Sequence, residues 1–504
     1  MIGVMKMNIN LNLHKGFADC INKMVKKYGE KFSLMNGFSN SNLNFTDFID
    51  NFIRSSSVAD TTIDANANST TLDVRTLLSD MVKPHTKLLS YNKIFGELSE
   101  KYGSELAEKW LEGEWNGQFY LHNSSTASFI PYCYAYDLDK LVEKGLFFIN
   151  KFKTAPCQHL TTFNDHVLEF ISWTANRSSG AVGLPSYLLY SYYFWYNDVK
   201  NNFFLKDPEY YRRQCFQKFI YDLNQPYLRV TECAFSNITV MDRNYLIELF
   251  GGRQFPNGDL VMDHIEQIIE HQKVFMEVVS EIREETMMTF PVLTYSLLFQ
   301  DGKFVDEEFA RWCNKHNMKW YDSNFYVGSD VSSLSNCCRL ISNTSKLNAF
   351  INSVGGTSLS VGSVQVNTIN LRRIAIEAEG SKEKFIEILK NRIDICVKVL
   401  DVVRDIIKQN IKEGLLPNYT SGLIELSKQY NTIGITAMYE ALYEFGLINT
   451  DEFENKSYSS EGLEFASKIL SVINEQKESY GFDYSINVEA VPAERANVVL
   501  SGKD

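Results

Sequence analysis

The sequence lacks the features that mark several classes of protein. Its 504 residues include nine cysteines but no Cys-x-x-Cys pair, so neither a zinc ribbon nor a disulfide framework is predicted. No apolar run is long enough to span a membrane, and residues 1–13 lack the charged and apolar segments of a signal peptide. We therefore expect a reduced, soluble protein of the cytoplasm that does not bind a membrane.

Positive charge is scarce as well. There are 50 Lys and Arg residues against 62 Asp and Glu, which gives a net charge of -12 and a pI near 5.3. Because nucleic acids are held by clustered Lys and Arg, this balance argues against a nucleic-acid-binding protein. The glycine-rich stretch at residues 177–185 contains neither Gly-x-Gly-x-x-Gly nor Gly-Lys-Ser, so it is not a phosphate-binding loop of those kinds.

Apolar residues, in contrast, are plentiful. They make up 44% of the chain, enough to bury a large core in one very large domain or in two to three ordinary ones. Residues 1–85 are rich in Asn, Ser and Asp, and we assign them to a helical and loop region, although a solvated connector explains their composition equally well. Residues 86–504 are assigned to the main domain.

Periodicity predicts alternating helices and strands in the main domain. Apolar residues recur at helical spacing over 91–113, 163–176, 258–288 and 384–411. Alternating or continuous apolar segments predict strands over 117–122, 290–299 and 358–370, the last passing directly into a helix at Leu371. A further strand begins at Asn487 and leads into a helix start with Pro492 in its first turn.

Two adjacent cysteines, Cys337 and Cys338, lie in a run of small polar residues that favours a loop. Neighbouring residues of an extended chain point in opposite directions, so one sulfur could face a cavity while the other packs behind it. Cys133 lies among aromatic residues that follow a polar loop. Taken singly, each of these cysteines is more often a small buried hydrophobe than a catalytic group.

Taken together, these stretches resemble the large subunit of the anaerobic, class III ribonucleoside-triphosphate reductases, a family of glycyl-radical enzymes. No single match is specific to this family. The whole set of matches in this order, which runs from about residue 64 to the end, is specific. The matching segments are Pro131-Tyr132-Cys133, Tyr136-Asp137-Leu138, Thr174-Ala175-Asn176-Arg177, residues 180–185, Asn224-Gln225-Pro226, Cys337-Cys338-Arg339, Thr368-Ile369-Asn370-Leu371 with Arg373-Ile374-Ala375, Ile433-Gly434 and Pro492-Ala493-Glu494.

The resemblance implies an α/β fold: a ten-stranded α/β barrel of two antiparallel five-stranded halves, with an internal finger loop and surrounding helices. Cys338 would be the thiyl radical that removes the 3′-hydrogen of the ribose, and Cys133 the thiol that forms a transient disulfide. The expected substrate-binding residues are His122, Asn123, Ser124 and Cys337, together with the phosphate-binding helix start at Pro492, Ala493, Glu494, Arg495, Ala496 and Asn497.

The resemblance also implies partners. These are ribonucleoside triphosphates as substrates, dNTPs as allosteric effectors, a second copy in a homodimer, and an iron-sulfur activase that uses S-adenosylmethionine to make the glycyl radical. We expect no cofactor or metal ion bound by this chain, because nothing in it matches the family's zinc site or radical glycine. A separate glycyl-radical polypeptide is expected to complete the enzyme.

Two further differences from the family concern control and the reductant. No counterpart of the family's ATP cone precedes Asp64, which argues against control of total activity by ATP and dATP. Ser363 stands where formate-using members carry asparagine, which puts formate in doubt as the reductant and leaves a redoxin-type protein plausible.

Two other functions remain open on the sequence. One is a glycyl-radical acyltransferase resembling pyruvate formate-lyase, in which neighbouring cysteines also occur. The other is a catalytically silent nucleotide-binding subunit.

Overall fold

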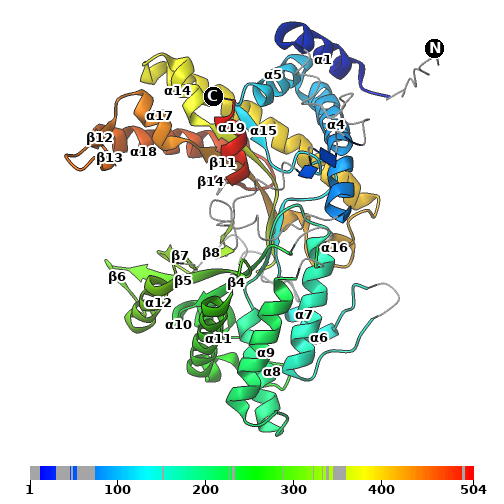
Figure 1. Ribbon diagram of the computed structural model, residues 1–504, viewed down its shortest axis with the longest axis vertical. Helices are drawn as coiled ribbons and strands as arrows, with labels where there is room; N and C mark the ends of the chain where they lie inside the picture. The colour runs from blue at the N-terminus through cyan, green and yellow to red at the C-terminus, as the bar shows by residue number, and fades with distance from the viewer. Residues whose placement is uncertain are drawn as a thin grey trace.

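A computed structural model describes most of the chain (Figure 1). The described residues are 12–29, 46, 49–50, 52–53, 74–149, 153–225, 228–229, 233–286, 288–321, 323–331, 333–336, 340–343, 359–490 and 494–503. Among them, no helix is long and apolar enough to cross a membrane.

One mixed ten-stranded sheet runs through the molecule. Its order is β14-β11-β10-β2-β3-β4-β5-β6, with β1 also paired to β10 and β7 to β5. The strands are β1 (Phe119–Leu121), β2 (Cys133–Ala135), β3 (Val182–Leu184), β4 (Ser236–Met241), β5 (Val292–Gln300), β6 (Lys303–Phe304), β7 (Ser323–Gly328), β10 (Val361–Asn370), β11 (Gln429–Thr436) and β14 (Ile486–Ala490).

The sheet has two halves that run in opposite directions. Strands β2, β3, β4, β5 and β7 are parallel to one another, as are β10, β11 and β14. The halves meet where β2 pairs antiparallel with β10. The predicted ten-stranded α/β fold with opposed halves is therefore confirmed, although the second half consists of three parallel strands plus β1, which is antiparallel to β10.

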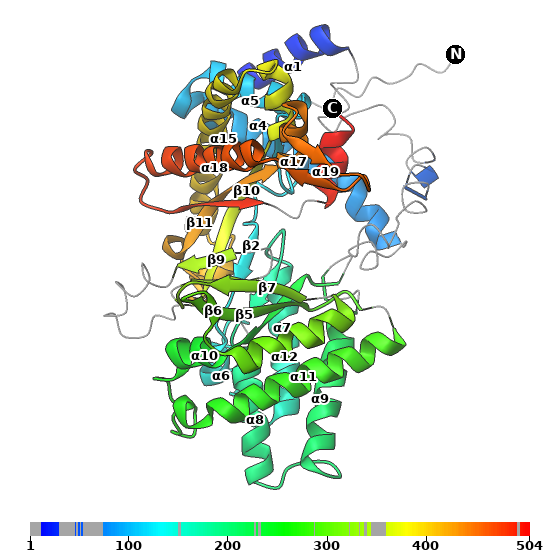
Figure 2. The same cartoon turned by 90° about the vertical axis from the view of Figure 1, so that its left-hand side faces the viewer.

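Helices cover the outside of each half and form two lobes (Figure 2). The first lobe packs Tyr134, Val182, Ile238, Leu293 and other apolar strand residues against its helices in one core. Its helices are α6 (Asp139–Lys144), α7 (Leu160–Ala175), α8 (Tyr187–Lys200), α9 (Pro208–Leu223), α10 (Arg243–Phe250), η3 (Val261–His264), α11 (Ile265–Glu285) and α12 (Glu307–Trp320).

The second lobe has a core of its own, which includes Ile369 of β10 and Ile433 of β11. The 31-residue helix α15 (Lys382–Lys412), about 46 Å long at the usual rise per residue, is its longest described helix. The other elements are α1 (Lys15–Tyr28), α4 (Val74–Tyr102), α5 (Ser104–Trp115), α14 (Leu371–Ala378), α16 (Pro417–Thr420), η4 (Leu426–Lys428), α17 (Met438–Glu444), α18 (Ser460–Glu478), α19 (Glu494–Ser501) and the hairpin β12 (Ile448–Thr450) and β13 (Lys456–Tyr458).

Most predicted elements are present with small shifts at their ends. The helices expected over 163–176 and 384–411 are α7 and α15, and the strand expected up to Asn370 is β10. The helical segment over 91–113 is instead divided into α4 and α5. Gly103 lies between them with a φ of 94°, a positive value that glycine adopts readily and that ends the first helix. The proposed boundary between residues 85 and 86 lies within α4.

A buried ion pair ties the end of β2 to the helices outside it. The carboxylate of Asp137 accepts from Arg253 at 2.7 Å and from the Ser186 hydroxyl at 2.9 Å, and the Asp137 side chain is fully buried. Burial disfavours the charged form of Arg253, but the attraction of Asp137 outweighs this and raises the pKa of the guanidinium. The pair therefore holds the start of the first lobe in place.

Replacing Arg253 with methionine should leave the Asp137 carboxylate buried without its cation. We expect Arg253→Met to lower the free energy of unfolding by roughly 3–5 kcal/mol, measured as a shift in urea midpoint. The control is Lys384→Met, which breaks an exposed pair with Glu379 and should change stability by less than about 1 kcal/mol. Equal losses of stability for the two substitutions would show that the Arg253–Asp137 pair does not stabilise the fold.

Candidate active site

The face of the sheet that points away from both large cores is the candidate site. Successive residues of a strand point to opposite faces, so residues between the core positions point to this interior face. Here a small separate cluster contains Cys133, Ala181 and Tyr430, with Tyr132 and Phe235 packed against it. Cys133 and Tyr430 come from β2 and β11, so the cluster joins the two halves.

Cys133 is the first residue of β2 and is fully buried. Its Sγ accepts a hydrogen bond from the backbone N–H of Ala181 at 3.2 Å. Its register partner in β10 is Ser363, whose hydroxyl lies 2.8 Å from that of Thr432 in β11. A thiol shielded from water in this way can exchange hydrogen or electrons with a molecule bound in the interior.

The described part of the predicted finger loop is a short hairpin of two strands. Strands β8 (Ser333–Asn336) and β9 (Leu340–Asn343) pair antiparallel. Strand β8 contacts β4, β5 and β7, and β9 contacts β10, so the hairpin lies between the two halves (Figure 2). Cys337 and Cys338 fall between β8 and β9 and lie outside the described residues.

His122 lies at the interior end of β1. Its Nε2 is 2.8 Å from the Thr368 hydroxyl of β10, and its ring makes edge contacts with Tyr120 and Tyr132. Burial lowers the pKa of the imidazole to about 4, so it is neutral near pH 7. A neutral, positioned imidazole can donate or accept one hydrogen bond without adding charge.

Asn123 and Ser124 take part in contacts that shape the loop after β1. Asn123 is exposed, has a φ of 45°, and donates from its side-chain amide to the Ser179 carbonyl at 2.9 Å. Ser124 is half-buried and lies near the Tyr91 phenol. Asn123 therefore connects this loop to the segment that enters β3, beside Cys133.

Polar groups that the sequence analysis did not assign also lie on the interior face. In β4 and β5, Asn237, Thr239, Thr294 and Ser296 are at most 1% exposed and alternate with residues of the first core. Among the residues that the structure describes, the Oδ1 of Asn237 and the hydroxyls of Thr239 and Ser296 find no hydrogen-bond partner. Buried polar groups of this kind are costly, so a bound polar molecule would satisfy them. The alternation of polar and apolar residues in these two strands was the sequence signal that could have identified this polar face.

Tyr430 was also missed by the sequence analysis. It lies on the same face of β11 as Thr432, while Ile433 and Ile435 point into the second core. The period-two pattern of residues 429–436 carries this information, but the neighbour that Tyr430 meets, Cys133, is almost 300 positions away.

Three helices begin at the carboxyl ends of the second half. Helix α14 follows β10, α17 follows β11 and α19 follows β14. The side chain of Asn370 caps α14 by accepting from the Arg372 backbone N–H at 3.1 Å. The N-terminus of a helix carries unpaired N–H groups and partial positive charge, so this edge of the sheet favours anions.

The predicted phosphate-binding residues that the structure describes lie at this edge. Pro492 and Ala493 are outside the described residues, and the backbone of Glu494 and Arg495 opens α19. Ala496 is buried, whereas Asn497 is exposed. The Thr436 hydroxyl at the end of β11 donates to Asn497 Oδ1 at 2.8 Å, which joins this strand end to the first turn of α19.

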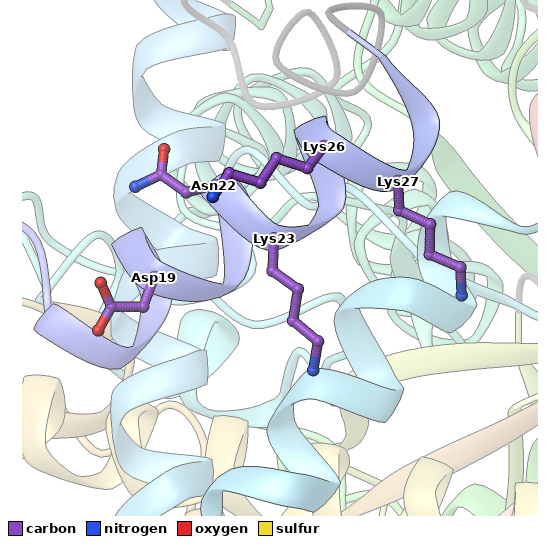
Figure 3. A pocket seen from close by; sticks show the side chains of 5 residues that line it. All are labelled: Asp19, Asn22, Lys23, Lys26 and Lys27. Atoms are coloured by element: carbon purple, nitrogen blue, oxygen red, sulfur yellow. The ribbon is translucent and has the colours of Figure 1, made fainter.

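A surface hollow of about 590 Å³ lies elsewhere, beside α1 (Figure 3). It is lined by Asp19, Asn22, Lys23, Lys26 and Lys27. Lys23 is paired with Glu108 at 2.5 Å and Lys27 with Glu112 at 2.6 Å. Two of its three cations are thus engaged with α5, and we do not assign the hollow to the active site.

The described residues contain no group of three or more His, Cys, Asp or Glu side chains that could hold a metal ion.

Comparisons with known proteins agree with this geometry. Residues 81–504 match the family model described as anaerobic ribonucleoside-triphosphate reductase. The structure resembles the anaerobic ribonucleotide reductase from Thermotoga maritima in complex with dATP and CTP, with 37% identity and a TM-score of 0.87 over 99% of this chain and 80% of that chain. The glycerol-bound structure of the same enzyme gives 39% identity and a TM-score of 0.86 over 99% and 79%.

A third structure, described as an anaerobic ribonucleotide reductase, gives 38% identity and a TM-score of 0.86 over 98% of this chain and 76% of that chain. A search of curated proteins gave no match. The family match and the structural likeness cover the whole candidate site, and the chain belongs to the anaerobic ribonucleoside-triphosphate reductases, which are oxidoreductases that act on nucleotides.

Proposed function

We propose that this chain reduces ribonucleoside triphosphates to deoxyribonucleoside triphosphates with cysteine thiols in the interior of the sheet. The observation that carries this proposal is the placement of Cys133. Its thiol is buried on the interior face, and the hairpin whose strands flank Cys337 and Cys338 lies between the two halves.

In the proposed reaction, a thiyl radical at Cys338 takes the 3′-hydrogen of the ribose, and the 2′-hydroxyl then leaves as water. The thiols of Cys133 and Cys337 would supply two hydrogen equivalents, one to the new C–H bond at C2′ and one to the water. Their sulfurs would then form a disulfide, which the reductant must reopen. Cys338 returns the 3′-hydrogen to its carbon, so its thiyl radical is regenerated.

The helix starts after β10, β11 and β14 would hold the triphosphate. Their N–H groups and dipoles favour negative charge, and Asn497 and Thr436 add polar side chains at the same edge. The similar reductase from Thermotoga maritima forms a complex with dATP and CTP, which supports nucleotide binding by a chain of this fold.

The remaining partners are part of the same proposal. An activase that uses S-adenosylmethionine and an iron-sulfur cluster would generate the glycyl radical on the separate glycyl-radical segment, which would also hold the zinc ion. The reductant would be a redoxin or formate, with Ser363 beside Cys133 favouring the redoxin. We further propose a homodimer with dNTP effectors, acting in the cytoplasm.

The proposal is tested by anaerobic reduction of CTP. The assay contains this chain, the radical-generating activase, S-adenosylmethionine, a reduced redoxin and the glycyl-radical segment of a related reductase. Formation of dCTP supports the proposal. Binding of CTP without product, once electron paramagnetic resonance shows a radical on the added segment, would instead indicate a silent nucleotide-binding subunit.

Replacing Cys133 with serine should remove the second thiol without removing the binding site. We expect Cys133→Ser to lower steady-state dCTP formation with redoxin by roughly a hundredfold or more, because the disulfide cannot form. Cys338→Ser should abolish product as well. Cys215→Ser, at a buried cysteine of the first core, is the control and should retain turnover. Undiminished turnover by Cys133→Ser would refute the role of this thiol.

Asn497 offers a test of the phosphate site. We expect Asn497→Ala to raise the Kd for CTP roughly tenfold, since it removes a hydrogen-bonding group that we place beside a triphosphate. Asn474→Ala, at an exposed position of α18, is the matched control and should leave the Kd unchanged. Isothermal titration calorimetry measures both, and identical affinities would remove Asn497 from the site.

His122 should make stability depend on pH. The pKa of His122 in the folded chain is about 4, below the ordinary value of 6.5. Between these two pH values the imidazole is protonated in the unfolded chain and neutral in the folded chain. Stability from this group is constant above about pH 6.5 and falls as the pH is lowered toward 4. We expect wild type to lose roughly 2 kcal/mol more than His122→Gln between about pH 7.5 and about pH 5 in urea unfolding. Parallel curves would show that His122 titrates normally.

A further inference from the structure

The segment that enters β3 contacts the Cys133 thiol through its backbone. The N–H of Ala181 donates to Cys133 Sγ at 3.2 Å. One residue earlier, the N–H of Gly180 donates to the Tyr132 carbonyl at 2.6 Å, and the Ser179 N–H donates to the Pro131 carbonyl at 2.9 Å. These hydrogen bonds hold residues 179–181 alongside residues 131–133.

Gly180 leaves the space that the sulfur needs. A Cβ atom at this position would lie 2.5 Å from Cys133 Sγ and 2.9 Å from the Tyr132 carbonyl oxygen, both too close for real contacts. The φ of Gly180 is not in the left-handed region, so the backbone would accept another residue there. Space beside the thiol, rather than backbone conformation, requires the glycine.

A second glycine confines Cys133 from the other side. A Cβ at Gly362 of β10 would lie 2.4 Å from the Cys133 carbonyl oxygen. Gly362 pairs with Tyr134, and Ser363 with Cys133, where β10 meets β2. The backbone of Cys133 is therefore set by β10, and the direction of its side chain is set by Gly180 and Ala181.

We propose that Gly180 and the Ala181 amide position the Cys133 thiol for disulfide formation. This inference rests on the proposed function, in which Cys133 bonds to Cys337. A disulfide requires an S–S distance near 2.05 Å and a narrow range of torsion angles, so the rotamer of Cys133 decides whether the bond can form. The Ala181 N–H also stabilises negative charge on the sulfur as its proton leaves.

The positioning role can be measured without radical chemistry. Diamide oxidises two thiols to a disulfide: both sulfurs lose a proton and an electron, and the reagent takes up two hydrogens to become a hydrazine. With the folded chain under anaerobic conditions, mass spectrometry follows the peptide that links Cys133 to the segment containing Cys337 and Cys338.

We expect Gly180→Ala to slow formation of the linked peptide roughly tenfold or more, because its methyl group displaces Sγ. The Kd for CTP should stay within about twofold, since Gly180 is not assigned to nucleotide binding. The matched control is Gly252→Ala, whose added Cβ would meet nothing within 4 Å, and its rate should equal that of wild type. Equal rates for Gly180→Ala and wild type would overturn the proposal.

A second measurement tests the contact itself and does not depend on the disulfide. Gly180→Ala should lower the melting temperature in wild type and lower it much less in a Cys133→Ala background, where no sulfur opposes the new methyl group. Equal losses in the two backgrounds would show that Gly180 does not act on the thiol, and would overturn the proposal.

The two measurements also separate this inference from the proposed function. Failure of wild type to form any linked peptide would refute the Cys133–Cys337 disulfide, while the melting cycle would still decide whether Gly180 positions Sγ.

Discussion

The antiparallel pairing of β2 with β10 is the constraint on which the rest of the structure depends. Three residue pairs, Ala135 with Val361, Tyr134 with Gly362 and Cys133 with Ser363, join the two halves of the sheet. Gly362 lets the two backbones approach closely at this point. Because the halves run in opposite directions from this junction, Cys133 lies where residues from both can meet one molecule.

The same pairing divides the side chains of the sheet between two environments. On the outer face, alternate apolar residues pack into two helical cores, whose burial supplies most of the stability of the lobes. On the interior face, residues such as Thr239, Ser296 and Thr432 are polar and nonetheless buried. An unpaired buried polar atom costs about 1–3 kcal/mol, so this face is better suited to binding than to packing.

The periodic segments of the sequence were sufficient to predict the scaffold. Helix α15 and the direct passage from β10 into α14 follow from local patterns, since amphipathic spacing and the cap at Asn370 act within a few residues. The break at Gly103 was missed because a glycine within a helical pattern does not always end a helix. The family resemblance led to Cys133 and His122, both of which are buried on the interior face of the sheet. Cys337 and Cys338 lie outside the described residues, so their roles remain predictions.

The sequence by itself determined which segments become helices and strands, the cysteines available for chemistry, and the family to which the chain belongs. These properties depend on neighbouring residues or on motif order. Only the tertiary structure decided that Gly180 confines the sulfur of Cys133, that Tyr430 packs beside it, and that Thr436 meets Asn497. Such contacts join residues dozens to hundreds of positions apart, and their geometry depends on strand register, which no local pattern specifies.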